Sequence, residues 1–165
     1  MKRPTVLAVR IVLAMVLVGS LFVQVVMVPL LAVDLDGLAP DYAYLRIPLI
    51  VIAVLAVLTV EVTFVCVWGL VTMARRGTVF SQAAFRYVDI ILTAVAAGSL
   101  LTFVLGVILA PGDAVAPGIV LLIGGAGVLI ACVALIVLVL RALLTQAVAR
   151  EAQANELQAE LNEVI

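Results

Sequence analysis

Residues 47–73, IPLIVIAVLAVLTVEVTFVCVWGLVTM, decide the fold of this chain, because they contain a single charged side chain, Glu61. A helix of this length exceeds the roughly 20 residues needed to cross about 30 Å of hydrocarbon. A membrane-spanning strand would be about half as long and would alternate apolar with polar residues, which this stretch does not do. The stretch therefore predicts a transmembrane helix.

Three further apolar runs of similar length flank this one, at about residues 11–33, 88–109 and 119–140. Hydrophobic residues make up 67% of the chain, and its mean hydropathy is +1.43. A soluble protein needs more polar surface than this composition supplies. We therefore predict one domain, an all-α polytopic membrane protein with four transmembrane helices in an antiparallel bundle.

The basic residues gather in segments that would share one side of the membrane. They are Lys2, Arg3, Arg10, Arg75, Arg76, Arg86, Arg141 and Arg150. The opposite loops hold Arg46 and four aspartates. Positively charged loops stay in the cytoplasm, so the pattern predicts that both termini lie inside. The first run is longer than the core of a secretory signal, which predicts an uncleaved helix.

Catalytic and metal-binding residue patterns are missing from the sequence. The chain has no histidine, and its two cysteines, Cys66 and Cys132, form no C-x-x-C pair. This excludes bis-histidine haem ligation, most zinc sites and histidine-based nucleophilic triads. Asp89 and Arg86 are more simply interpreted as an ion pair at the membrane border. We predict no cofactor, no metal site and no enzymatic activity.

Glu61 is the one ionisable side chain expected deep in hydrocarbon, where charge is costly and the neutral acid is favoured. Counting from the helix ends places Gln24, Ser99 and Thr102 at comparable depths. One interpretation is a proton or cation site in which Glu61 titrates. The other is a protonated Glu61 that hydrogen-bonds Gln24 or a hydroxyl and holds two helices together.

The cytoplasmic turn at residues 75–81, RRGTVFS, contains three candidate contact residues, Arg75, Arg76 and Phe80. Aromatic and basic side chains of this kind anchor a helix end at the membrane interface. The same side chains would also suit contact with a protein partner. Both interpretations remain open at the level of sequence.

The segment at about residues 141–163 lacks Pro and Gly, so the last helix should continue into the cytoplasm. Apolar residues recur along it at spacings of three, four or seven. The residues predicted to meet a partner are Glu156, Leu157, Glu160, Leu161 and Glu163. Membrane-surface helices are usually basic, and this one is acidic, so it should project away from lipid. It would pair with its own copy, bind a basic soluble protein, or stay solvated alone.

The chain resembles the bacterial four-helix membrane proteins grouped as domain of unknown function 2975. The resemblance rests on length and layout, on RGTVFS at residues 76–81 leading to Phe85-Arg86, and on LQAELNEVI at residues 157–165. No activity is established for that family, so the resemblance implies no catalytic residues. Its genes often neighbour a small helix-turn-helix regulator, which implies a membrane protein that controls a DNA-binding partner.

Two hypotheses follow for the function. The first is a regulatory or scaffolding protein of the bacterial inner membrane. It would present the 75–81 turn and the acidic C-terminal helix to a basic cytoplasmic protein, with no direct nucleic-acid binding. A homodimer is compatible with it. The alternative is a small proton-coupled transporter that uses Glu61. Four-helix multidrug exporters carry their embedded carboxylate on the first helix, whereas here it lies on the second.

Overall fold

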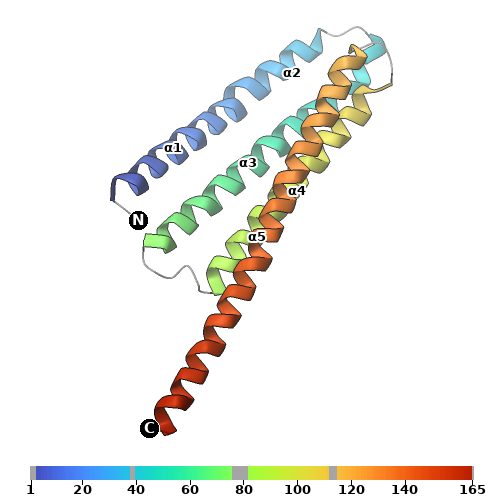
Figure 1. The fold of residues 1–165 in the computed structure, drawn as a ribbon. Coiled ribbons are helices and arrows are strands. Elements are labelled where there is room, and N and C mark those ends of the chain that lie inside the picture. Colours follow the sequence, from blue (N-terminus) through green and yellow to red (C-terminus); the bar gives the residue numbers. More distant parts are fainter. Residues whose placement is uncertain (1–2, 38–39, 76–81, 112–114, 165) are drawn as a thin grey trace.

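The computed structural model describes residues 3–37, 40–75, 82–111 and 115–164, and every regular element in these ranges is helical (Figure 1). The elements are α1 (Arg3–Phe22), the π-helix η1 (Val23–Met27), α2 (Val28–Asp36), the 3₁₀-helix η2 (Pro40–Leu45), α3 (Arg46–Arg75), α4 (Gln82–Leu109) and α5 (Pro117–Val164). Four helical stretches in the described residues are long and apolar enough to cross a membrane. The predicted all-α, multi-pass membrane fold is confirmed.

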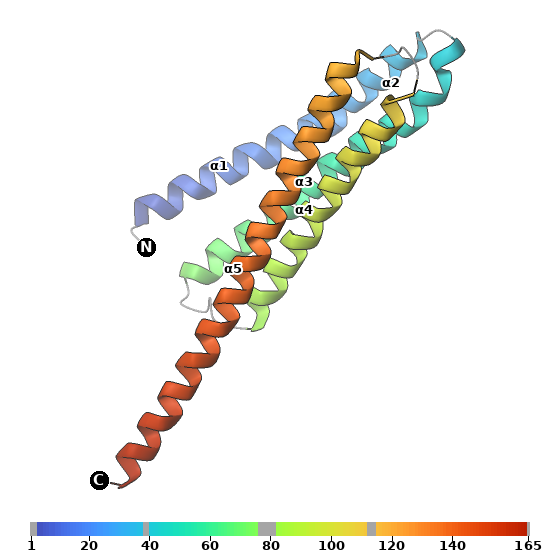
Figure 2. The ribbon, with the colours of Figure 1, turned by 45° about the vertical axis from the view of Figure 1, so that its right-hand side comes forward.

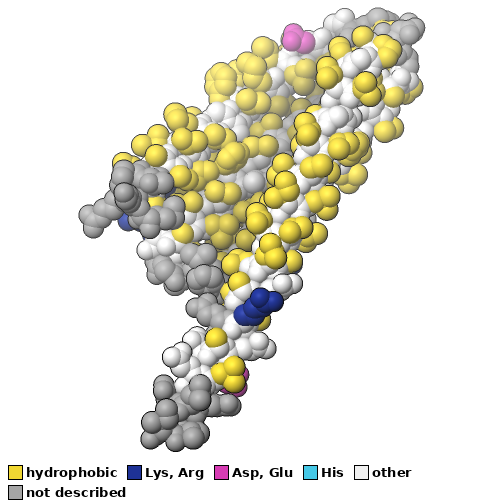
Figure 3. Space-filling view, in the orientation of Figure 1, with side chains coloured by type: hydrophobic (Ala, Val, Ile, Leu, Met, Phe, Trp, Pro, Cys, Tyr) yellow, Lys and Arg dark blue, Asp and Glu magenta, His cyan; other side chains and the backbone are white. Residues whose placement is uncertain are grey.

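Each of the four helical stretches extends beyond the apolar run that predicted it. The four stretches are Val6–Asp36, Tyr42–Arg75, Ala83–Leu109 and Pro117–Gln158. Several of their ends carry charged side chains, such as Asp36, Arg75 and Arg86, which stop the hydrocarbon-compatible run but not the backbone hydrogen bonding of the helix. On the face drawn in Figure 3, apolar side chains cover the middle of the molecule, and charged ones lie towards its two ends.

The four stretches form an open antiparallel layer (Figures 1 and 2). The rod made of α1, η1 and α2 packs against α3, α3 packs against α4, and α4 packs against α5. The contact of α1 with α3 is less extensive than the contacts on either side of α4. Several of the most buried side chains lie on α4: Ala84, Ile91, Ala94, Ser99 and Leu109. The layer is therefore held most tightly around α4.

The first rod contains a turn of π-helix because of a proline. The N–H of Val28 bonds to the carbonyl of Val23, five residues back, where an α-helix would use four. Pro29 lies in the first turn of α2; it has no N–H to donate, and its ring would clash with the carbonyl of Val25. The wider π turn lets the rod continue past Pro29 without breaking.

Aromatic rings of α4 pack onto glycines of both neighbouring helices. A Cβ added to Gly69 of α3 would lie 2.9 Å from Cε1 of Tyr87. A Cβ added to Gly127 of α5 would lie 3.2 Å from Cζ of Phe103. The absent side chains allow these close approaches, which supply the van der Waals contact that drives helix association in lipid.

The fourth apolar run and the C-terminal segment form one uninterrupted helix. At 48 residues, α5 is about 72 Å long, against about 30 Å of hydrocarbon. Among the described side chains of α5, Val148 is the last half-buried one, and those from Ala149 to Gln158 are exposed. The end of α5 therefore projects past α4 as a rod of about 24 Å, residues 149–164 (Figure 1).

The glycine contacts predict a stability difference between two otherwise similar substitutions. Gly69→Val should destabilise the protein by about 1–3 kcal/mol, because the new side chain collides with the Tyr87 ring. Gly124→Val is the matched control, since nothing lies within 4 Å of its added Cβ. The measurement is the unfolding midpoint in detergent. Equal midpoints for the two variants would show that the Tyr87 contact does not hold α3 and α4 together.

Candidate functional site

Glu61 lies on the side of α3 that faces the first rod. One stripe of α3 recurs every three or four residues: Ala53, Val57, Glu61, Phe64, Trp68 and Thr72. Trp68 and Thr72, at one end of this stripe, contact Arg10 of α1. Ala53 and Val57, at the other end, line a groove together with η1 and α2. Glu61 lies between these contacts and shares their face.

A matching stripe on the first rod faces α3. Its residues are buried or half-buried: Val6, Arg10, Leu13, Leu17, Ser20 and Gln24. With Arg10 opposite Trp68 and Thr72, the antiparallel register places Ser20 near the level of Glu61 and Gln24 about one turn further along. We call these two facing stripes the α1–α3 seam. Gln24 belongs to the π-helix η1, so the irregular turn of the first rod lies near the carboxylate of α3.

The carboxyl group of Glu61 is incompletely satisfied. Its Oε1 is buried and has no hydrogen-bond partner among the described residues. The nearby hydroxyls of Thr59 and Thr63 donate to backbone carbonyls of their own helix, at 2.7 Å each. A buried acceptor without a partner costs free energy. Packing of the helices therefore gives no reason for a carboxyl group at this position.

The other two residues of the predicted cluster are bonded elsewhere. Ser99 donates to the carbonyl of Gly127 on α5 at 2.9 Å and is buried in the α4–α5 contact. Thr102 donates to the carbonyl of Gly98 on its own helix at 2.8 Å. Of the residues grouped by depth, Gln24 is therefore the one that shares the α1–α3 seam with Glu61.

A groove leads along the seam towards Glu61. It has a volume of about 330 Å³ and lies between α3 and the rod formed by η1 and α2. Its lining comprises Val23, Met27, Val28, Leu30, Leu31, Asp34, Ala53 and Val57. Asp34 marks the end nearest the loop, and Val57 lies one helical turn from Glu61. The groove thus connects the end of the molecule with the neighbourhood of the buried carboxyl.

Arg10 also lies in the α1–α3 seam, although in the sequence it contributed only to the predicted orientation in the membrane. Its Nη2 donates to Oγ1 of Thr72 at 3.1 Å, and its guanidinium carbon lies 5.6 Å from the ring centroid of Trp68. Its Nε is buried and has no hydrogen-bond partner among the described residues. A cation over an indole face is attracted by the ring quadrupole. The spacing of Trp68 and Thr72, one turn apart, is the sequence signal that would have suggested a shared partner.

Asp89 pairs with Arg141 of α5, not with Arg86 as the sequence suggested. The Nη2 of Arg141 donates to Oδ2 at 2.9 Å, while Nε lies 2.6 Å from Oδ1. The Nε–H is not aligned as a hydrogen bond, so we ascribe the contact to the Nη2 bond and to charge attraction. A planar guanidinium can reach across to the adjacent helix, and both of its neighbouring donors then face one carboxylate.

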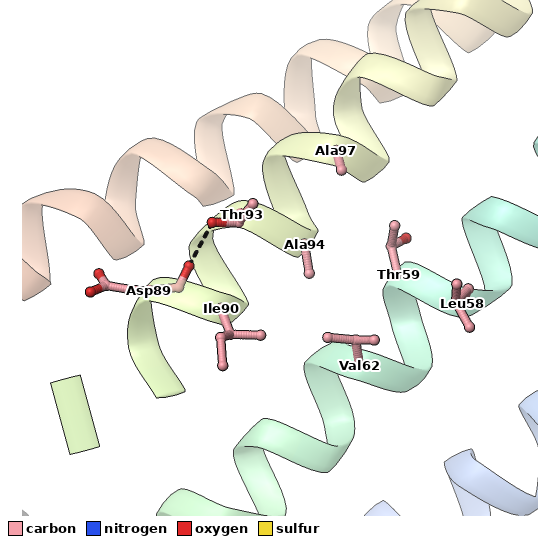
Figure 4. A pocket seen from close by; sticks show the side chains of 8 residues that line it. All are labelled: Leu58, Thr59, Val62, Asp89, Ile90, Thr93, Ala94 and Ala97. Carbon is pink, nitrogen blue, oxygen red and sulfur yellow. Dashed lines mark hydrogen bonds between the residues drawn. The ribbon is translucent and has the colours of Figure 1, made fainter. Parts of the chain in front are cut away.

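A second groove lies between α3 and α4, with a volume of about 390 Å³. Figure 4 shows Ile90, Ala94 and Ala97 of α4 facing Thr59 and Val62 of α3, with Leu58 at the margin of the groove. The hydroxyls at its margin, from Thr59 and Thr93, are bonded to carbonyls of their own helices. Five of its eight lining residues are aliphatic, and the ionisable one, Asp89, is held in the ion pair with Arg141, so the groove offers no free group for acid, base or nucleophilic chemistry. No cluster of metal-ligating side chains occurs in the described residues.

The described members of the predicted partner-binding set lie at the end of the molecule from which α5 projects. Arg75 is exposed at the end of α3, and Glu156 and Leu157 are exposed on the α5 rod. Arg76 and Phe80 lie outside the described residues. The backbone of α5 includes Glu160, Leu161 and Glu163, whose side chains are also outside the description.

Comparison with protein families supplies the identification. A family model described as "Protein of unknown function (DUF2975)" matches residues 30–165. This chain belongs to the DUF2975 family. The match starts in α2 and includes α3, α4 and the whole α5 rod. Comparisons with curated proteins and with solved structures gave no match. The DUF2975 description names no activity and therefore assigns no functional residues to this chain.

The unpartnered Glu61 predicts that removal of its carboxyl group will stabilise this DUF2975 protein. Glu61→Leu should raise stability by about 1–3 kcal/mol, because a buried acceptor is replaced by an apolar side chain. Val60→Leu, at the adjacent and more exposed position, should change it little. Unfolding midpoints in detergent measure the difference. A loss of stability in Glu61→Leu would show instead that the carboxyl group bonds α3 to the first rod.

Proposed function

We propose that this DUF2975 protein is a regulatory or scaffolding protein of the bacterial cell membrane, which holds a cytoplasmic protein at its α5 rod. The observation that carries the proposal is the projection of α5 beyond α4, with every described side chain from Ala149 to Gln158 exposed. A helix that served only to span lipid would not need this extension. The rod offers contact residues from both its apolar and its acidic positions, including Leu157 and Glu156.

The distribution of basic residues supports a cytoplasmic location for the rod. The start of α1, the end of α3 and the start of α4 lie at the end of the layer from which the rod projects (Figure 1). Arg75, Arg86 and Arg141 belong to this end, while Arg46 lies at the other. Because basic segments remain on the cytoplasmic side, both termini would face the cytoplasm of a bacterial cell.

The charge of the rod favours a protein over the membrane surface as its ligand. Beyond Arg150 the chain carries four glutamates, Glu151, Glu156, Glu160 and Glu163, and no basic residue. The cytoplasmic leaflet is negatively charged and would repel this segment. A basic protein would be attracted to it, and small DNA-binding regulators have basic surfaces. A helix-turn-helix regulator is therefore a suitable class of partner.

Charge substitutions on the rod test this proposal. Tagged full-length protein purified from the membranes of its host should retain a basic cytoplasmic protein, identified by mass spectrometry. Glu156→Lys combined with Glu163→Lys should release it, whereas Glu156→Asp with Glu163→Asp, which keeps the charge, should not. Truncation after Arg141 should also release it. Recovery of the same proteins with and without the rod would contradict the proposal.

A second candidate function is transport of protons or cations through the α1–α3 seam. Two observations favour it: Oε1 of Glu61 has no partner in the described residues, and the groove from Asp34 ends one turn away at Val57. An ionisable group inside the membrane usually serves an ion pathway when it is not paired structurally. The less extensive contact of α1 with α3 would permit small movements at this seam.

Proton flux into liposomes that contain the purified full-length protein tests the second candidate. With an imposed membrane potential and a pH-sensitive dye inside, the unaltered protein should conduct protons above the background of empty liposomes. Glu61→Gln keeps size and hydrogen bonding but cannot titrate, so the flux should fall to background. Thr102→Val, whose hydroxyl bonds only its own helix in the structure, should retain it. Unchanged flux in Glu61→Gln would eliminate this function.

A further inference from the structure

One stripe of α5 repeats with a seven-residue period through the rod. Its positions alternate at spacings of three and four residues. They are Leu140, Leu143, Ala147, Arg150, Ala154, Leu157, Leu161 and Val164. In the heptad notation of coiled coils, Leu140 takes position a and Leu143 position d. Apart from Arg150, every a and d residue is apolar, which is the pattern of a two-helix interface.

The stripe lies on a different side of α5 from the α4 contact. The residues of α5 that pack on α4 include Gly127, Ala134 and Arg141, which occupy position b of the same heptads. The a and d side chains described from Leu140 to Leu157 are all exposed. Leu157, well beyond the end of α4, is 61% exposed. The packing within one molecule therefore leaves this stripe uncovered.

Lipid cannot cover the far end of the stripe. Inside the membrane the same positions continue towards the start of α5, for example Ile136 and Val133, and hydrocarbon solvates them there. The rod beyond Arg150 is acidic and is repelled by an anionic membrane surface. Ala154 and Leu157 would then be left in water, on a helix that is otherwise polar at this level.

We propose that two copies of this chain associate through this stripe of α5 and form a parallel two-stranded coiled coil beyond the membrane. The membrane gives both copies the same orientation, so their α5 helices run parallel. Because the two sequences are identical, each position a then lies opposite position a of the other copy, and each position d lies opposite position d, without a shift in register. No other described helix of the chain projects in this way to provide a different match.

The charges near Arg150 complement each other in this arrangement. Arg150 occupies position d, and Glu151 occupies the neighbouring position e. In a parallel coiled coil, a d residue of one helix packs beside the e position of the other. Arg150 therefore comes next to Glu151 of the second copy, and the relation holds in both directions. A single charged residue in an apolar stripe lowers stability but fixes register and the number of strands.

The membrane provides the concentration that the pairing needs. Ala147 and Ala154 at position a bury little surface, so the isolated rod would associate weakly in water. Tethering both helices in one bilayer holds them at a high effective concentration, which converts weak contacts into a populated dimer. Glu156 and Glu163 occupy position c, outside the paired surface. The pairing buries Leu157 between the two copies. Where the proposed function is correct, the partner therefore contacts the acidic side chains, which the dimer offers twice, as suits a partner with two-fold symmetry.

Disulfide cross-linking in membranes tests the coiled coil. The background is the full-length chain with Cys66→Ala and Cys132→Ala, which removes both native thiols. Leu157→Cys places a thiol at position d, and Ala152→Cys places the control thiol at position f on the opposite face. After oxidation, Leu157→Cys should give a covalent dimer in several-fold higher yield than Ala152→Cys. Equal yields, or no dimer from Leu157→Cys, would overturn the proposal.

Charge variants of Arg150 provide a second measurement that does not depend on a loss of folding. In the Leu157→Cys background, Arg150→Glu puts like charges beside Glu151 of the second copy and should abolish the cross-link. Arg150→Leu removes the polar residue and should preserve it. Cross-linking that is the same in both variants would contradict the assigned register. If no dimer forms but Glu156→Lys combined with Glu163→Lys still releases a partner, the coiled coil is rejected and the proposed function is not.

Discussion

The structure depends on one constraint: hydrocarbon offers no hydrogen bonds to the backbone. Each peptide group inside the membrane must find its partner within the chain, so the spanning segments are helices. The π turn at Val23–Met27 obeys the same constraint, because it carries the rod past Pro29 with the N–H of Val28 bonded to Val23. Van der Waals contact then supplies the association of the helices, through the rings of Tyr87 and Phe103 against glycines.

The two halves of the helical layer differ in how their buried polar side chains are hydrogen-bonded. Around α4 the polar side chains have partners: Ser99 donates to the carbonyl of Gly127, and Asp89 forms an ion pair with Arg141, although Nε of Arg141 makes no aligned hydrogen bond. Along the α1–α3 seam, Oε1 of Glu61 and Nε of Arg10 are buried without partners in the described residues. The tightly packed half of the layer supports the α5 rod. The other half contains the costly groups, which are the ones expected to be retained for function.

The helical fold follows from the sequence because lipid simplifies the problem: long apolar runs in a membrane have one backbone solution. Helix contacts do not follow in this way, since lipid-facing and helix-facing positions are both apolar and hydrophobic periodicity is lost. Depth along the helix was therefore the available guide, and it grouped Glu61 with Ser99, which faces α5 instead. It also linked Asp89 to Arg86, although a guanidinium from α5 reaches the same carboxylate. In the rod, where water restores the contrast between faces, periodicity again indicates the contact side.

The central claim is that lipid solvates the helical layer and that the acidic rod leaves it on the cytoplasmic side. Topology reporters test this claim most directly in living bacterial cells. Green fluorescent protein fused after Ile165 should fluoresce, and alkaline phosphatase inserted after Gly37, between α2 and α3, should be active. Active phosphatase fused after Ile165, together with inactive phosphatase after Gly37, would contradict the account.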